Sequence, residues 1–439
     1  MRRIVIIGGG YAGFYTAWKL EKRLREGEAE VVVIDPLPYM TYQPFLPEVM
    51  AGSVEPRHAL ISLRRHLHRT ELITATVTHI DHAHKSVEVQ PAAGEGYDLR
   101  YDILVVTAGA VTRTFPIPGV QSEAIGLKTI EEAVAIRDRL IANFDLASAM
   151  EPGEERSRLL AVTFVGGGFA GVEGFGELLS LATSLLKSYP ELSFDELNFQ
   201  LVEAQSRILP EVSDKVGAWV VAALEDRGAR IHLDTQILSA VDGHVVLSNG
   251  DRYESDLIVW TAGTAANPLL TKHTDLPIDE RGRLIVGADL RVRDAKGAVV
   301  TDVWGAGDNA AVPDISKNAA RSTTVPNAQH AVRQGRRLAA NLVAALRGEQ
   351  PANYIHPNLG VVATLGLYTG VFQSGPFVVK GFPAWLMHRG YHVFAIPTWE
   401  RKIRVLAVWV LAFLLGRDIV SIEKTQHPRD AFEQIGTRR

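Results

Sequence analysis

The first 35 residues combine apolar runs with a glycine-rich turn. Residues 4–7 (IVII) form a continuous β-branched run, which is typical of a strand buried on both faces of a parallel sheet. The turn GGGYAG follows at 8–13, and helical spacing of apolar residues follows over 14–25. Another buried strand is predicted at 31–34, and it ends in Asp35. The pattern therefore predicts a strand, a glycine turn, a helix and a second strand.

The same order of elements recurs in the middle of the chain. An apolar strand is predicted at 159–165, the turn GGGFAG occupies 166–171, and a helix is expected over 174–188. The next apolar strand, at 199–202, ends in Glu203. Strands that alternate with helices favour parallel sheets, so we expect an α/β fold with two Rossmann-like dinucleotide-binding domains.

The glycines and the acids at the strand ends are the first candidate chemistry. In such a turn the first glycine allows a tight bend, the second lets backbone amides approach a diphosphate, and the third lets helix and strand pack closely. The helix N-terminus attracts the phosphates, and the acid accepts hydrogen bonds from ribose hydroxyls. Glu203 would also repel a ribose 2′-phosphate, which favours NADH over NADPH. The alternative for Glu203 is a solvated acid at a strand end.

Two further segments are near-copies of each other. Residues 101–109 read YDILVVTAG, and residues 255–263 read SDLIVWTAG. Each is predicted to be a buried strand that ends in a turn of small residues, and the repetition suggests two related units. A third segment, DVWGAGDN at 302–309, places Asp308 on a glycine-flanked turn where it could meet a polyol chain.

Composition narrows the chemistry further. The 439 residues include 46 Lys+Arg and 50 Asp+Glu, a formal charge of −4, which does not favour a nucleic-acid partner. The chain contains no cysteine, so disulfides, thiolate metal sites and dithiol relays are excluded. We expect no metal site, because His79, His82 and His84 lie in a predicted hairpin between Val77 and Val89 with no further ligand indicated nearby.

Together these motifs resemble the two-dinucleotide-binding-domain flavoproteins, which share a glutathione reductase-like architecture. In that group the first motif holds FAD, and a second, inserted motif holds the nicotinamide cofactor. Relatives that pass electrons through cysteine sulfur are excluded by the composition. The segments at 39–48, 168–173 and 326–335 are similar to elements near the flavin in type II NADH:quinone oxidoreductases, so the chain resembles that family.

The resemblance implies which residues hold the cofactors. FAD would be held by Gly8, Gly10, Tyr11, Ala12, Gly13, Asp35, Gln43, Val77, Thr107, Ala108, Gly109, Gly307, Asp308 and Gln329. NADH would be held by Gly166, Gly168, Phe169, Ala170, Gly171, Glu173, Glu203, Ala262 and Gly263.

Two of these residues are also catalytic candidates. In the family, the acid at the position of Glu173 lies close to the flavin and is discussed as a proton donor or relay, and Gln329 belongs to the element beside the isoalloxazine and the quinone entrance. The alternative for Glu173 is an acid that complements the dipole in the first helical turn. The implied reaction is hydride transfer from NADH to flavin N5 and two-electron reduction of a quinone without proton pumping. A ferredoxin or rubredoxin reductase and a flavin-bound NADH sensor are the alternatives.

The C-terminal segment has a different pattern. Two helices are predicted on either side of Pro397, with Thr398 as the N-cap of the second and basic residues beside the apolar run 405–416. That run is well short of the ~20 residues that span a bilayer. The tryptophans of the C-terminal segment (Trp385, Trp399 and Trp409) and the neighbouring Arg and Lys favour helices that lie in the headgroup region of a membrane. A buried core helix is the alternative.

The expected organisation follows from these assignments. A discontinuous FAD-binding domain is expected at 1–118 and 268–345, an NADH-binding domain at 119–267, and a membrane-anchoring and quinone-access segment at 346–439. The expected partners are a membrane quinone and a membrane surface, with a homodimer left open. The N-terminal apolar stretch is too short for a secretory signal, so the enzyme is expected at the cytoplasmic face of the cell membrane.

Overall fold

A computed structural model of the chain describes residues 1–316, 322–356 and 360–421. The chain divides into a first compact unit (1–41, 60–111 and 264–358) and a second one (42–59, 112–263 and 359–439). Each unit contains one of the two glycine turns, and the segment 42–59 and the C-terminal residues belong with the second turn. The expected domain ranges stay predictions, and residues 422–439 lie outside the described part of the chain.

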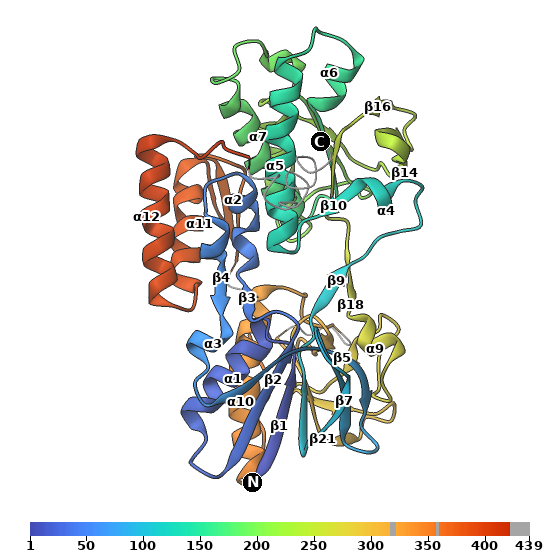
Figure 1. Ribbon diagram of the computed structural model, residues 1–439, viewed down its shortest axis with the longest axis vertical. Coiled ribbons are helices and arrows are strands. Elements are labelled where there is room, and N and C mark those ends of the chain that lie inside the picture. Colours follow the sequence, from blue (N-terminus) through green and yellow to red (C-terminus); the bar gives the residue numbers. More distant parts are fainter. Residues whose placement is uncertain (317–321, 357–359, 422–439) are drawn as a thin grey trace, which may run out of the picture. The chain divides into compact units, whose positions relative to one another are not determined.

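The first unit is built on an eight-stranded sheet with the order β20-β21-β8-β1-β2-β5-β6-β7. Figure 1 labels β1, β2, β5, β7 and β21 of this sheet. Its centre is parallel: β1 (Arg2–Ile7) pairs with β2 (Ala29–Asp35) and β8 (Ile103–Val106). β21 (Val299–Gly305) extends the parallel part beyond β8, and β5 (Thr70–Asp81) extends it beyond β2. All four residues of the predicted strand core in β1 are buried, as expected for a strand covered on both faces.

Two helices of this unit, α1 (Tyr11–Arg23) and α10 (Ala328–Leu346), pack against each other. Gly335 makes the contact close, because a Cβ there would lie 2.5 Å from Ala12 O. The predicted hairpin is present, with Val77 of β5 opposite Val89. The remaining elements in or at the edge of this unit are β3 (Tyr39–Thr41), β4 (Leu60–Ser62), α3 (Leu63–His66), β6 (Ser86–Pro91), β7 (Tyr97–Arg100), β9 (Ala110–Thr112), β18 (Thr264–Ala266), α9 (Pro268–Lys272), β19 (Leu284–Ile285), β20 (Arg291–Arg293) and β22 (Ala310–Ala311).

The second unit contains a five-stranded parallel sheet with the order β10-β17-β11-β12-β13. These strands are β10 (Ala124–Gly126), β17 (Leu257–Trp260), β11 (Ala161–Val165), β12 (Asn198–Val202) and β13 (Arg230–His232). The strand predicted at 159–165 is too long, because Leu159 ends the preceding helix α6 (Glu154–Leu159). The helix predicted at 174–188 begins earlier, since α7 spans Phe169–Leu185.

The C-terminal residues add a three-stranded antiparallel sheet to this unit, β23 (Val361–Thr364), β24 (Gly370–Ser374) and β25 (Phe377–Lys380). Helix α11 (Phe382–Ala395) packs against this sheet and against α12 (Trp399–Leu415) (Figure 1). The two predicted helices are therefore present. Thr398 occupies the N-cap position of α12, but its side chain makes no capping hydrogen bond.

The other elements of the second unit are η1 (Gln43–Phe45), α2 (Leu46–Met50), η2 (Pro56–Ala59), α4 (Val120–Glu123), α5 (Ile130–Ser148), η3 (Phe194–Glu196), α8 (Asp214–Glu225), β14 (Ile237–Ser239), η4 (Val241–Gly243), β15 (His244–Leu247) and β16 (Arg252–Glu254). The short helix α2 packs against α5 and α7, and α7 contacts β23. Among the helices of the described residues, none combines the length and the hydropathy of a membrane span.

Candidate functional site

The first glycine turn presses the start of α1 against the end of β1. Gly8 has a left-handed φ of +95° and donates its N–H to Ile34 O at 2.9 Å. A Cβ on Gly13 would lie 1.8 Å from Gly8 O, so glycine is required for this close approach. A Cβ on Gly10, in contrast, would meet no atom of the described residues within 4 Å beyond its chain neighbours. The turn therefore leaves open space at the N-terminus of α1, where an anion is favoured.

Asp35 closes this turn from the end of β2. Its Oδ2 accepts the Gly9 N–H at 2.6 Å, and its Oδ1 accepts the Leu37 N–H at 2.7 Å. Burial raises the pKa of this carboxyl above its ordinary 3.8, and the two backbone hydrogen bonds oppose the shift. A carboxylate oxygen can accept more than one hydrogen bond, so both oxygens retain capacity for ribose hydroxyls.

The small-residue turn after β8 is tied to the first glycine turn. Thr107 Oγ1 lies 2.9 Å from both Ile7 O and Gly8 O. The Gly109 N–H donates to Asn309 Oδ1 at 3.1 Å, and Asn309 Nδ2 donates in turn to the carbonyl of Val106 at 3.0 Å. The side chain of Asn309 thus brings the Thr107–Ala108–Gly109 turn next to the loop that carries Gly307 and Asp308.

Gln334 of α10 holds the other side of that loop. Its Oε1 accepts the Gly307 N–H at 2.8 Å, and its Nε2 donates to Thr324 Oγ1 at 3.1 Å. Gln334 and Asn309 were not among the expected site residues, although both lie inside or next to motifs that the sequence marks. Their role is to fix the loop that carries Asp308, and only the three-dimensional contacts reveal it.

The second glycine turn repeats the first contact by contact. Gly166 has φ +111° and donates to Val202 O at 2.8 Å, and a Cβ on Gly171 would lie 1.9 Å from Gly166 O. Thr261 Oγ1 lies 2.9 Å from Val165 O and 3.0 Å from Gly166 O, as Thr107 does in the first unit. The predicted internal duplication is therefore present in the structure.

Glu203 takes the place of Asp35 in this second copy. Its Oε2 accepts the Gly167 N–H at 2.6 Å, and its Oε1 accepts the Gln205 N–H at 2.8 Å. A Cβ on Gly168 would again meet no other atom of the described residues within 4 Å, apart from its neighbours. Glu203 is thus bound to the turn itself, which does not fit a merely solvated acid.

Both turns fit an adenine dinucleotide. Each provides open space at a helix N-terminus, and the first turns of α1 and α7 contain no acidic residue that would repel a diphosphate. Each also provides a carboxylate at the end of the adjacent strand. The turn glycines and the strand-end acids that the sequence assigns to FAD and NADH are therefore placed as such sites require, one set in each unit.

Glu173 lies in the second turn of α7, because the helix begins at Phe169. The interpretation of Glu173 as a first-turn acid is therefore wrong. Its Oε1 accepts the Thr364 N–H of β23 at 3.1 Å and lies 3.1 Å from His388 Nε2 of α11. Glu173 is thus held by two C-terminal elements, which the local sequence around it does not reveal.

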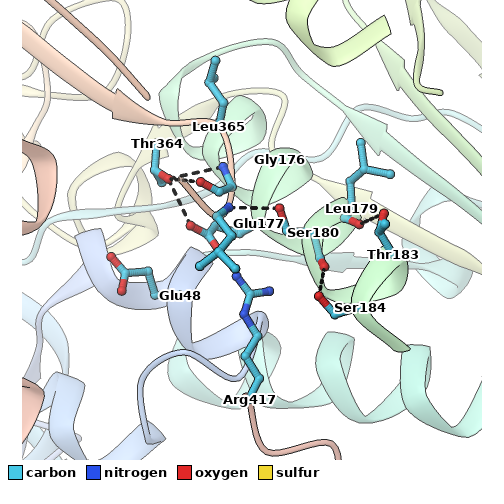
Figure 2. Close-up of polar contacts among 12 residues, drawn as sticks. Glu48, Gly176, Glu177, Leu179, Ser180, Thr183, Ser184, Thr364, Leu365 and Arg417 are labelled. Atoms are coloured by element: carbon cyan, nitrogen blue, oxygen red, sulfur yellow. Dashed lines mark hydrogen bonds and ion pairs between the residues drawn. The ribbon is translucent and has the colours of Figure 1, made fainter. Parts of the chain in front are cut away.

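A second carboxylate of α7, Glu177, is also held by the C-terminal segment. Figure 2 shows Thr364 and Arg417 converging on it: Thr364 Oγ1 donates to Oε1 at 3.0 Å, and Arg417 Nη2 contacts Oε2 at 3.1 Å. Glu48 of α2, labelled in the same view, pairs with Arg389 Nη1 at 3.0 Å. These buried polar contacts join segments more than 180 residues apart along the chain, and no periodicity or motif predicts them.

Several assigned residues are placed without their roles being tested. Gln43 lies in η1 and donates to Lys128 O at 3.3 Å, whereas Gln329 is the second residue of α10 in the other unit. Val77 is buried within β5, opposite its partner strand. Ala262 and Gly263 follow β17, in the position that Ala108 and Gly109 have after β8. The expected contacts of these residues with a flavin or a nicotinamide stay predictions.

Two histidines of the predicted hairpin contact different residues. His82 Nδ1 lies 3.0 Å from Tyr101 Oη, and His84 Nδ1 lies 2.7 Å from Asp81 Oδ2. Within residues 1–316, 322–356 and 360–421, no group of three or more acidic, histidine or cysteine side chains is arranged to hold a metal ion.

Comparisons with known proteins agree with this geometry. The sequence pattern of the family described as Pyridine nucleotide-disulphide oxidoreductase matches residues 2–335. The type II NADH:quinone oxidoreductase Ndh of Mycobacterium tuberculosis is 29% identical over 452 aligned positions, which cover 99% of this chain and 93% of the relative. The type II NADH:quinone oxidoreductase of Staphylococcus epidermidis is 29% identical, with 84% of this chain and 89% of the relative covered.

A solved structure has the same fold over nearly the whole chain. NDH2 of Plasmodium falciparum in complex with NADH matches with a TM-score of 0.87 at 18% identity, covering 95% of this chain and 99% of that one. The likeness at this identity concerns the fold. The family pattern spans well over half of the chain, although the chain has no cysteine for disulfide chemistry. The chain therefore belongs to the pyridine nucleotide-disulphide oxidoreductase family, as a cysteine-free member similar to type II NADH:quinone oxidoreductases.

Proposed function

We propose that the protein is an FAD-dependent NADH:quinone oxidoreductase of type II that does not pump protons. The observation that carries the proposal is the pair of equivalent glycine turns, each closed by a carboxylate, in a chain without cysteine. Two such turns fit two dinucleotides, and the absence of cysteine leaves electron transfer to the flavin itself. The quinone is proposed from the names of the curated relatives.

The chain's own residues would bind and orient the two cofactors. The N-termini of α1 and α7 would stabilise the diphosphates, and Asp35 and Glu203 would accept hydrogen bonds from the ribose hydroxyls of FAD and NADH. Bound FAD would supply the two-electron chemistry between nicotinamide and quinone. Gln329 is proposed to contact the flavin or the quinone, and Gln43 to line the flavin surroundings.

Glu173 is the proposed proton donor. NADH delivers two electrons and one proton, whereas a quinol carries two electrons and two protons more than the quinone, so one proton per turnover comes from elsewhere. The Glu173 side chain is 12% exposed, compared with 1% for His388 beside it. Of these two side chains, Glu173 is therefore the one that a substrate could reach.

The C-terminal helices are proposed to dock on a membrane surface. Helix α12 buries only Val405 fully. Its exposed large apolar residues are Trp399, Ile403, Leu406, Val410, Leu411, Phe413, Leu414 and Leu415, which we call the apolar face of α12. Phe413 is 73% and Leu415 82% exposed, and Lys402 lies 5.1 Å from the Phe394 ring and 5.4 Å from the Trp399 ring. An apolar face bordered by cations and aromatic rings suits the headgroup region.

The length of α12 supports a helix that lies on the membrane. Its 17 residues span about 25 Å at ~1.5 Å per residue, less than the ~30 Å hydrocarbon core. We therefore propose a peripheral enzyme at the cytoplasmic face of the cell membrane, where its substrate NADH is found. The alternative is a dimer in which a second copy of the chain covers the apolar face of α12.

Vesicle flotation separates these two occupants. The wild type should float with phospholipid vesicles that contain an anionic lipid, and Leu414→Glu should lose most of that binding. Leu146→Glu is the matched control, because Leu146 is also an exposed leucine (52%) but lies on α5. Protein that stays at the bottom of the gradient and sediments as a dimer would contradict the membrane assignment.

The enzymatic proposal is tested by NADH oxidation. Purified protein should be yellow and should oxidise NADH faster when a soluble quinone analogue is added. Colourless protein, or oxidation that a quinone does not stimulate, would overturn the proposal. Reoxidation of the reduced flavin only by an oxidised iron–sulfur protein would favour a ferredoxin-type reductase. Slow reoxidation by every acceptor would favour a sensor.

A further inference from the structure

A row of buried titratable groups runs through the second unit, and the proposed function uses only its last member, Glu173. Tyr42 Oη lies 3.0 Å from His392 Nδ1, the ring centroids of His392 and His388 are 4.4 Å apart, and His388 Nε2 lies 3.1 Å from Glu173 Oε1. His388 is 1% and His392 8% exposed. The row therefore connects α11 to the carboxylate of α7 through the interior.

Carboxylates face both ring nitrogens of His388. Nε2 faces Glu173, and Nδ1 lies 4.0 Å from Glu48 Oε1 of α2. Neither nitrogen has an aligned hydrogen bond to any of the described residues, so the ring is held mainly by charge. A neutral imidazole offers one N–H, whereas the imidazolium offers a donor to each carboxylate.

The other charged groups in this interior are partly paired with one another. Arg389, next to His388 on α11, forms an ion pair with Glu48 Oε2 at 3.0 Å. Trp409 of α12 donates to the same oxygen at 2.8 Å. Glu177, Arg227 and Arg417 are further charged groups near this cluster.

The pKa values of His388 and His392 are shifted in opposite directions. Burial lowers the pKa of His388, but Glu173 and Glu48 outweigh burial and Arg389, so this pKa is raised above its ordinary 6.5. Burial lowers the pKa of His392 well below 6.5, and the neighbouring His388 lowers it further. The surroundings of His388 therefore favour the imidazolium, and those of His392 favour the neutral ring.

We propose that His388 keeps one proton in the protein interior and supplies it through Glu173 to the quinone as the quinone is reduced. This inference rests on the proposed NADH:quinone activity. The His388 N–H bond breaks as Glu173 takes the proton, and the Glu173 O–H bond breaks as a quinone oxygen takes it. A solvent proton then restores the imidazolium of His388. No electron moves in these steps.

The test compares His388→Gln with His244→Gln in the full-length, FAD-loaded protein. His244 is a matched control, because it also faces a carboxylate of the same unit, 3.2 Å from Glu254 Oε1, but its side chain is 64% exposed. The kcat is measured between about pH 6 and about pH 9 with a soluble quinone analogue and with ferricyanide. Ferricyanide accepts electrons without protons, so only the quinone reaction needs the stored proton.

We expect His388→Gln to lower kcat with the quinone by at least about tenfold and to flatten its pH profile. The ferricyanide rate should change less than about twofold, and His244→Gln should match the wild type in both assays. An equal loss with both acceptors would overturn the proposal, because it indicates a purely structural role. An unchanged quinone rate would overturn it as well.

A second measurement does not depend on turnover. A raised pKa means that charged His388 stabilises the fold fully below about pH 6.5, and that this stabilisation is lost as the pH rises through the folded-state pKa. The Tm difference between wild type and His388→Gln should therefore be largest near the acid end of the range and should shrink as the pH rises. A pH-independent difference would contradict a stored proton.

The design also covers a His388→Gln variant that does not fold and a wild type that reduces no quinone. If His388→Gln does not fold, Glu173→Gln takes its place: the amide still accepts the Thr364 N–H but cannot relay a proton, so the same selective loss with the quinone is expected, and its absence would overturn the proposal. If the wild type reduces no quinone, the proposed function fails, whereas the Tm series still measures whether His388 is charged.

Discussion

The second glycine turn allows a prediction that separates nucleotide binding from folding. Gly168 and Gly171 stand three residues apart, but a methyl group meets different surroundings at each. A Cβ on Gly171 would lie 1.9 Å from Gly166 O, a backbone atom that cannot move alone. A Cβ on Gly168 would meet only open space within the described residues, and its φ of −72° and ψ of −180° are accessible to alanine.

The expected magnitudes differ accordingly. Overpacking against backbone costs about 1–3 kcal/mol, so Gly171→Ala should lower Tm by about 2–4 °C for each kcal/mol. Gly168→Ala should change stability by less than about 0.5 kcal/mol. The methyl group at residue 168 would instead occupy the space of the diphosphate, and we expect the Kd for NADH to rise about tenfold, which corresponds to ~1.4 kcal/mol.

The assay uses thermal unfolding and NADH titration of the FAD-loaded protein, with the wild type as reference. We expect Gly168→Ala to have a normal Tm and weak NADH binding, and Gly171→Ala to have a lowered Tm. If Gly168→Ala binds NADH as the wild type does, the second turn is not the nicotinamide cofactor site. If both variants lose the same stability, a methyl group on residue 168 meets other atoms of the protein, and the space beside Gly168 is not open.

Two further predictions concern acids of the second unit. Glu203→Gln should lower the preference for NADH over NADPH about tenfold. The substitution removes the charge that repels a 2′-phosphate, while the amide can still accept the Gly167 N–H. An unchanged ratio of the kcat/KM values for NADH and NADPH would contradict the ribose assignment. Asp256→Asn should lower the free energy of unfolding by about 1–3 kcal/mol, because the carboxylate is 2% exposed and accepts hydrogen bonds from Arg139 and Asn143. Burial raises the pKa of Asp256, but these hydrogen bonds outweigh it and hold the pKa below 3.8, so the loss should be present above pH 3.8 and fade as the pH falls through the folded-state pKa. Denaturant unfolding across this pH range measures it.

The sequence predicts the parts of the structure that depend on local pattern. The apolar runs of β1 and β11, the glycine turns and the acids Asp35 and Glu203 are local signals. The structure has each of them where the pattern places it, except that β11 begins at Ala161 and not at residue 159. Turn chemistry and strand periodicity are determined within a few residues, so they can be read without knowledge of the fold.

The polar interior of the second unit could not be predicted in the same way. Glu48 belongs to a five-residue helix, and its partners Arg389 and Trp409 follow more than 340 residues later. Buried ion pairs of this kind depend on tertiary packing and leave no period or spacing in the sequence. The same holds for Glu173, which the local pattern places at a helix start but which β23 and α11 engage in the folded chain.

The C-terminal helices combine features that the local pattern predicts with features that depend on tertiary packing. Their positions and the break at Pro397 follow from the sequence. Helix α11 buries Ala384, His388, Arg389 and His392, whereas α12 exposes its apolar face. Periodicity identifies an apolar stripe but does not say whether protein or lipid covers it.

The central claim, direct electron transfer from the flavin to a quinone, is tested most directly by anaerobic stopped-flow absorbance. The FAD-loaded protein is first reduced with one equivalent of NADH and then mixed with a soluble quinone analogue. Bleaching of the flavin band by NADH, followed by its full return at a rate that matches steady-state kcat or exceeds it, is the predicted result. A flavin that NADH does not bleach, or that the quinone does not reoxidise, would contradict the account.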